Sequence, residues 1–182
     1  QAPPRQIAYA CAPMNASRFD MALRRGVVAH QAGQFAEAEI RYREALAIAP
    51  NDPEAISLLG LALNQSARVG EGTPMLERAV ELDPRKVILR FNLVEGLEAA
   101  GDLDRAIGVL HTVLESDPGN LHAWVKAGDI AQQQGDLPGA IEAWNRAHDA
   151  HPSASKPVAR LARLELGRGK AAEAMLILDT LL

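Results

Sequence analysis

Apolar and small residues recur along this chain at the spacing of a helix, and the whole pattern repeats at a fixed period. Four prolines mark that period, each standing 34 residues from the next: Pro50, Pro84, Pro118 and Pro152. Counted from residue 19, the period divides the chain into the blocks 19–52, 53–86, 87–120, 121–154 and a shorter 155–182. A constant period of this length predicts a repeat protein, in which each repeat is one small supersecondary unit.

Each block predicts two helices joined by a short turn. In the fourth block both halves carry apolar residues at helical spacing, first Trp124, Ala127 and Ala131, then Ala140, Trp144 and Ala147. Glycine suits the left-handed conformation that ends a helix, and four blocks have it in one column near their middle: Gly33, Gly101, Gly135 and Gly169. Asp102 and Asp136 follow as candidate caps of the second helix. The prolines close the blocks because proline cannot continue a helix.

The second block departs from this pattern. It has Ala67 in the glycine column, followed by Gly70, Gly72 and Pro74 where its second helix would begin. Because glycine and proline both disfavour helix interiors, we expect this helix to start late, with Thr73 as its cap. The resulting bend is either a local irregularity or a hinge that sets the pitch of the array.

Two further columns hold small residues, which predicts close contact between helices. One contains Ala38, Gly72, Ala106, Ala140 and Ala174, and the other contains Gly26, Gly60, Val94, Gly128 and Ala162. A helix of about 12 residues is marginal alone in water, so burial against neighbouring repeats has to stabilise it. The chain is therefore expected to fold as an all-α, quasi-linear stack of helix pairs.

The fourth block carries the residues by which the chain resembles the tetratricopeptide repeat (TPR) family. The family's signature Trp, Gly, Ala, aromatic, Ala and Pro correspond to Trp124, Gly128, Ala140, Trp144, Ala147 and Pro152. The resemblance covers residues 19–182. It implies antiparallel helix pairs stacked into a right-handed α-α superhelix, with a concave groove that serves as a scaffold for protein and peptide binding.

In this family the first helix of each repeat lines the groove at fixed positions. Carried over to this chain, the resemblance implies an apolar strip of Leu23, Val27, Leu58, Leu61, Ile88 and Phe91. It also implies polar and charged groove residues, namely Asn92, Glu95, Glu98, His122, Lys126, Asp129, Lys156, Arg160 and Arg163. We expect apolar anchors around Leu61 and Phe91, and orientation of the peptide by Lys126, Arg160 and Arg163. The competing interpretation is a merely solvated charged face with apolar residues that only pack between helices.

Composition and motifs exclude several classes of function. The formal net charge is −4, which gives no general attraction for nucleic acid. The apolar runs are too short for insertion into a membrane, and the single Cys11 excludes an intramolecular disulfide. The chain contains no catalytic, phosphate-binding or metal-binding motif. We therefore expect a soluble cytoplasmic or periplasmic protein with a protein or peptide partner, with neither cofactor nor enzyme activity in these residues.

The two ends of the sequence carry separate expectations. Residues 1–18, with Pro3, Pro4 and Ile7, are expected to form an extended segment that lies in a groove of this chain or of a neighbouring copy. The last block ends with Leu176, Leu178 and other apolar residues uncovered, which predicts a longer parent chain or self-association. Two alternative functions follow: the targeting region of a larger bacterial transferase or hydroxylase, and a subunit that forms homo-oligomers through its C-terminal end or N-terminal segment.

Overall fold

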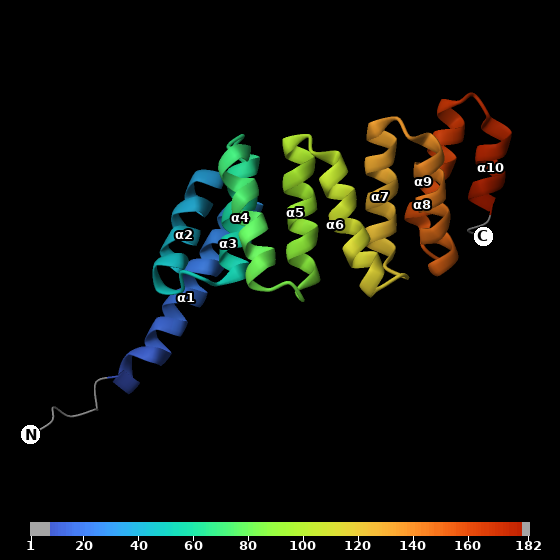
Figure 1. Ribbon diagram of the computed structural model, residues 1–182. Coiled ribbons are helices and arrows are strands. Elements are labelled where there is room, and N and C mark those ends of the chain that lie inside the picture. The colour runs from blue at the N-terminus through green and yellow to red at the C-terminus, as the bar shows by residue number, and fades with distance from the viewer. Residues whose placement is uncertain (1–7, 180–182) are drawn as a thin grey trace, which may run out of the picture. The chain divides into compact units, whose positions relative to one another are not determined.

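The computed structural model describes residues 8–179 of the chain, with side chains from residue 17 onward (Figure 1). Within these residues the chain forms ten α-helices and no strand, which confirms the all-α fold class. The helices are α1 (Ala8–Gln31), α2 (Phe35–Ile48), α3 (Pro53–Gln65), α4 (Val69–Leu82), α5 (Val87–Ala100), α6 (Leu103–Ser116), α7 (Leu121–Gln134), α8 (Leu137–Ala150), α9 (Ser155–Gly167) and α10 (Ala171–Asp179).

Two compact units divide the chain, with α1 to α5 in residues 1–101 and α6 to α10 in residues 102–182. In the first unit α1 packs on α2 and α3 packs on α4, while α2 also contacts α3 and α5 lies against both α3 and α4. In the second unit α7 packs on α8 and α9 on α10, while α6 contacts α7 and α8 contacts α9. Within each unit, a helix is therefore stabilised mainly by helices that are near it in sequence.

The turns inside the helix pairs have the capping that the sequence predicts. Gly33, Gly101, Gly135 and Gly169 all take the left-handed conformation, with φ between 72° and 81°. The carboxylate of Asp136 accepts a hydrogen bond from the backbone N–H of Gly139 at 3.0 Å, and Asp102 caps α6 in the same way. Ala67 replaces glycine at the equivalent turn and still has a φ of 62°, a conformation that costs a residue with a Cβ atom about 1–2 kcal/mol.

Aromatic rings fill the space that the glycine column leaves. In the first unit the ring of Tyr42 on α2 lies against Gly26 on α1, and in the second unit the indole of Trp144 on α8 lies against Gly128 on α7. A Cβ atom on either glycine would overlap the ring, and both aromatic side chains are fully buried. The small residues in this column thus allow a large side chain from the second helix of the pair to pack at the helix crossing.

Tyr42 is expected to make the stability of the first unit depend on pH in the alkaline range. Burial raises the pKa of Tyr42 to about 12, so the folded state keeps this proton at pH values where the unfolded chain, with a pKa near 10, has lost it. The free energy of unfolding is therefore expected to be unaffected by this group below pH 10 and to fall by roughly 2–3 kcal/mol between about pH 10 and pH 12. Urea denaturation at a series of pH values measures this fall.

Tyr42→Phe is the matched control for the alkaline titration. It keeps the buried ring but loses the hydroxyl, which lies 3.2 Å from Nδ1 of His30. The variant is expected to start from a lower stability and to show a smaller alkaline fall than the wild type. Parallel pH profiles for the two proteins would contradict the assignment of this titration to Tyr42.

The second block does not have the late helix that was expected, because α4 begins at Val69 and contains Gly70, Gly72 and Pro74. Gly72 lies against the carbonyl of Gly60 and the side-chain amide of Asn64 on α3. Gly72 thus allows α3 and α4 to approach closely, and it does not break α4. Thr73 is not the cap: its buried hydroxyl donates to the carbonyl of Gly96 on α5 at 3.3 Å.

The N-terminal segment also differs from expectation. Helix α1 starts at Ala8, so residues 8–18 are helical rather than extended, while residues 1–7 lie outside the described part of the chain. The sequence AYACA at the start of α1 is rich in alanine, the residue with the highest helix propensity, and Pro13 follows it inside the helix. A prediction that the whole segment lies extended in a groove is therefore wrong for residues 8–18.

Candidate functional site

The apolar part of the predicted surface lies in the first unit and belongs partly to its core. Leu23 and Val27 on α1 and Leu58 on α3 are partly buried. They pack against the buried cluster of Ala29, Ala38, Tyr42, Leu59, Ala62 and Leu63. Leu61 on α3 and Phe91 on α5 are also partly buried. These residues therefore contribute to folding as well as presenting apolar area to solvent.

The polar residues predicted on α5 have different environments. The Nδ2 of Asn92 donates a 2.8 Å hydrogen bond to Oγ of Ser57, a fully buried residue on α3. This bond connects the first helices of two successive pairs and commits part of the Asn92 amide to the fold. Glu95, one turn further along α5, is exposed. Of the two, Glu95 is thus the more accessible to a partner.

The charged part of the predicted surface lies in the second unit, where α7 and α9 are joined by an ion pair. Nε and Nη2 of Arg160 donate to the two carboxylate oxygens of Asp129 at 2.7 and 2.9 Å. The hydrogen bonds to Asp129 raise the pKa of Arg160 above its usual value, so this guanidinium is firmly charged. Sequence reasoning placed these two residues in the groove but did not pair them. The charge of Arg160 is already balanced before any ligand binds.

Lys156 and Arg163 differ from Arg160 because both are exposed and, among the described residues, neither makes an ion pair. The three basic residues stand at positions i, i+4 and i+7 of α9, which places them on one face of the helix. On α7, Lys126 is partly buried and His122 is exposed. The second unit therefore presents a basic helix face with two cations available to a ligand.

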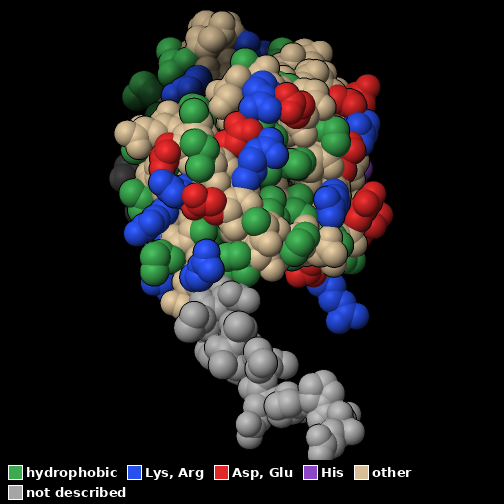
Figure 2. All heavy atoms as spheres, turned by 90° about the vertical axis from the view of Figure 1, so that its left-hand side faces the viewer, with side chains coloured by type: hydrophobic (Ala, Val, Ile, Leu, Met, Phe, Trp, Pro, Cys, Tyr) green, Lys and Arg blue, Asp and Glu red, His purple; other side chains and the backbone are tan. Residues whose placement is uncertain are grey.

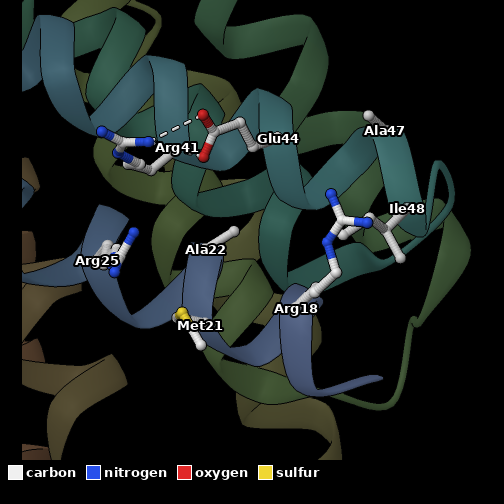
Figure 3. Close-up of a pocket in the computed structure, with 8 residues that line it drawn as sticks. All are labelled: Arg18, Met21, Ala22, Arg25, Arg41, Glu44, Ala47 and Ile48. Atoms are coloured by element: carbon white, nitrogen blue, oxygen red, sulfur yellow. Dashed lines mark hydrogen bonds and ion pairs between the residues drawn. The ribbon is translucent and has the colours of Figure 1, made fainter. Parts of the chain in front are cut away.

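A recess that sequence reasoning missed lies between α1 and α2 and has a volume of about 600 Å³ (Figure 3). Arg18, Met21 and Arg25 line it from α1, and Arg41 and Glu44 are among the residues that line it from α2. The recess does not include the predicted apolar residues Leu23 and Val27. Two residues turn a helix by about 200°, so Met21 and Leu23 point to different sides of α1.

The described residues contain neither a candidate metal cluster nor a helix that could span a membrane. No three His, Cys, Asp or Glu side chains in that part of the chain lie close enough to hold a metal ion. None of its helices combines the length and apolar character needed to cross a bilayer. His151, which follows α8, instead stabilises a turn: its Nε2 lies 2.7 Å from the carbonyl oxygen of Gly119.

Repeated helix pairs, left-handed glycines in the turns and small residues at the crossings define an α-helical repeat protein. The chain belongs to the tetratricopeptide repeat family, whose model matches residues 12–53, 58–120, 94–155 and 125–182. A TPR repeat-containing protein of Pseudomonas aeruginosa is 37% identical over 71 residues, which cover 39% of this chain and 68% of that relative. The family is one of protein-interaction scaffolds, and this chain falls in that functional class.

Solved structures show the same fold. A crystal structure of the MamA protein matches with a TM-score of 0.69 over 92% of this chain and 91% of MamA, at 20% identity. A crystal structure of YrrB, described as a TPR protein with an unusual peptide-binding site, matches with a TM-score of 0.63 at 27% identity, over 73% of this chain and 69% of YrrB. The described residues thus form TPR helix pairs.

Proposed function

We propose that this chain binds an acidic peptide segment of a partner protein on the first helices of its TPR pairs. The observation that carries the proposal is the basic face of α9, where exposed Lys156 and Arg163 flank an Arg160 that Asp129 holds in place. Two cations without an ion pair, one on each side of a fixed guanidinium, provide electrostatic complementarity to a chain of carboxylates. The likeness to YrrB supports a peptide as the kind of ligand.

The first unit is proposed to add apolar contacts. Leu61 on α3 and Phe91 on α5 are partly buried, so each has a side chain that is held by its neighbours and still reaches solvent. Side chains ordered in this way lose little conformational entropy on binding, which favours them as anchors. Each unit is thus considered by itself, with apolar contacts proposed for the first unit and charge for the second.

Reversing the two cations of α9 tests the charge part of the proposal. Lys156→Glu combined with Arg163→Glu is expected to weaken binding of a short fluorescein-labelled peptide of glutamate and leucine by roughly tenfold or more, because attraction becomes repulsion. Fluorescence anisotropy measures the affinity, and a version of the peptide with glutamine in place of glutamate shows how much of it depends on charge.

Arg146→Glu is the matched control. Arg146 is an exposed arginine of the same unit, but it lies on α8, the second helix of its pair. Its reversal is expected to leave the affinity within about twofold of the wild type, since exposed charges outside a contact have small effects. Circular dichroism checks that all variants keep their helicity. Unchanged binding by the α9 double variant would overturn the proposal.

The alternatives from the sequence remain separate hypotheses. A role as the targeting region of a larger enzyme uses the same binding face. Self-association through the last helix pair is compatible with the exposed Met175 and Leu176 on α10. Self-association does not predict that charge reversal on α9, but not on α8, weakens binding of an acidic peptide.

A further inference from the structure

The recess between α1 and α2 differs in chemistry from the equivalent surfaces of the later helix pairs. At the position of Arg25, the other repeats have apolar residues, namely Leu59, Leu93, Ala127 and Leu161. At the position of Arg41, they again have apolar residues, namely Met75, Val109, Ala143 and Ile177. Met21 is 49% exposed, while its counterparts Ala55, Leu89 and Ala123 are buried. The first pair therefore carries two arginines in columns that are otherwise apolar.

The arginines of the recess are not equivalent to one another. Arg41 donates to Glu37 at 2.8 Å and to Glu44 at 2.9 and 3.0 Å, so its charge is balanced within α2. The hydrogen bonds to Glu44 and Glu37 raise the pKa of Arg41 above its usual value. Arg18 and Arg25 are exposed, and neither makes an ion pair with another described residue. The recess thus has two cations available to a ligand beside a third that is already neutralised.

Apolar surface lies between these charges. Met21 stands between Arg18 and Arg25 on the same side of α1, and Ile48 of α2 also lines the recess, as Figure 3 shows. On the side of the molecule where α1 and α2 lie, Figure 2 shows basic side chains set among hydrophobic and acidic ones. A surface of this kind suits a ligand with an apolar side chain flanked by carboxylates.

We propose that this recess is a second docking surface, separate from the first-helix faces, and that it takes an acidic partner segment carrying one large apolar side chain. The apolar side chain would rest on Met21 and Ile48, and its neighbouring carboxylates would pair with Arg18 and Arg25. A second copy stacked here as one more repeat fits less well, because it would bury Arg25 where every other repeat has an apolar residue.

Paired variants in the first unit test the proposal, because this unit offers a control for each contact. The probe is a short fluorescein-labelled peptide with one leucine flanked by glutamates, measured by anisotropy against each variant of the full chain. Arg25→Glu is expected to weaken binding by roughly tenfold, and Met21→Ala by roughly threefold. Two variants outside the recess serve as controls: Arg85→Glu reverses an exposed arginine in the turn between α4 and α5, and Val28→Ala truncates an exposed apolar side chain of α1. Both are expected to stay within about twofold of the wild type.

Each other outcome overturns the proposal. Equal losses in Arg85→Glu and Arg25→Glu would show only a general charge effect. No measurable binding by the wild type, or binding that only Arg163→Glu abolishes, would rule out the recess as the docking surface, and the second result would still support peptide binding on α9. Light scattering of the free protein covers the remaining case: a dimer that Arg25→Glu dissociates would show that a second copy occupies the recess.

Discussion

Replacing Trp144 with alanine is expected to destabilise the second unit by about 3–5 kcal/mol. The indole is completely buried, lies against Gly128 and belongs to a cluster with Ala131, Ala140 and Leu164. Its removal leaves a cavity beside a glycine that has no side chain to fill it. The buried indole N–H has no hydrogen-bond partner among the described residues, so the expected loss is one of packing. Urea denaturation followed by circular dichroism measures the change in the free energy of unfolding.

Trp124→Ala provides the matched comparison within the same repeat. Trp124 is only partly buried, and its indole N–H donates to the carbonyl of Pro118 at 2.7 Å. Its replacement is expected to cost about 1–2 kcal/mol, from one hydrogen bond and a smaller apolar contact. If the two alanine variants lose equal stability, the central role given to the contact between Trp144 and Gly128 is wrong.

Gly72→Ala is expected to destabilise the first unit by about 3 kcal/mol although alanine is the better helix former. The added methyl group would overlap the carbonyl of Gly60 and the amide of Asn64, so α3 and α4 would have to move apart. The Asn64 amide is buried, so close packing leaves it little room to rotate away. Thermal and urea denaturation measure the loss.

Gly70→Ala should have the opposite sign. Gly70 lies on the same helix two residues earlier, and a Cβ atom built there meets nothing within 4 Å. The substitution is expected to stabilise the protein by about 0.5 kcal/mol, because alanine loses less backbone entropy than glycine when a helix forms. If Gly70→Ala and Gly72→Ala changed the free energy of unfolding in the same direction, this would contradict the close contact between α3 and α4.

Local signals explain why most of the fold could be predicted. In the pair α7 and α8, helical spacing, a left-handed Gly135, the Asp136 cap and the closing Pro152 all act within a few residues, and each is visible in the sequence. The start of α4 could not be found in this way. There the role of Gly72 depends on Gly60 in the neighbouring helix, which local propensity does not register.

The candidate site could be predicted by position but not by interaction. The residues of the first-helix faces follow from their place in the repeat, and the structure finds Arg163 and Glu95 exposed there. The pairing of Arg160 with Asp129 depends on the distance and rotamers of two helices, which spacing along one helix does not reveal. The sequence indicates the recess between α1 and α2 only through Arg25 and Arg41, which stand at repeat positions that are apolar in the other repeats.

The polar bonds between successive helix pairs have a consequence for how the chain folds and evolves. Asn92 and Ser57 are 35 residues apart, and Arg160 and Asp129 are 31 apart, so each bond closes a loop of about one period. Loops of this size close with a modest and nearly constant entropy cost wherever they lie in the chain. Folding can therefore nucleate at any pair and spread to its neighbours. By the same reasoning, a gene that gains or loses one whole period outside these loops keeps both bonds at their original separation.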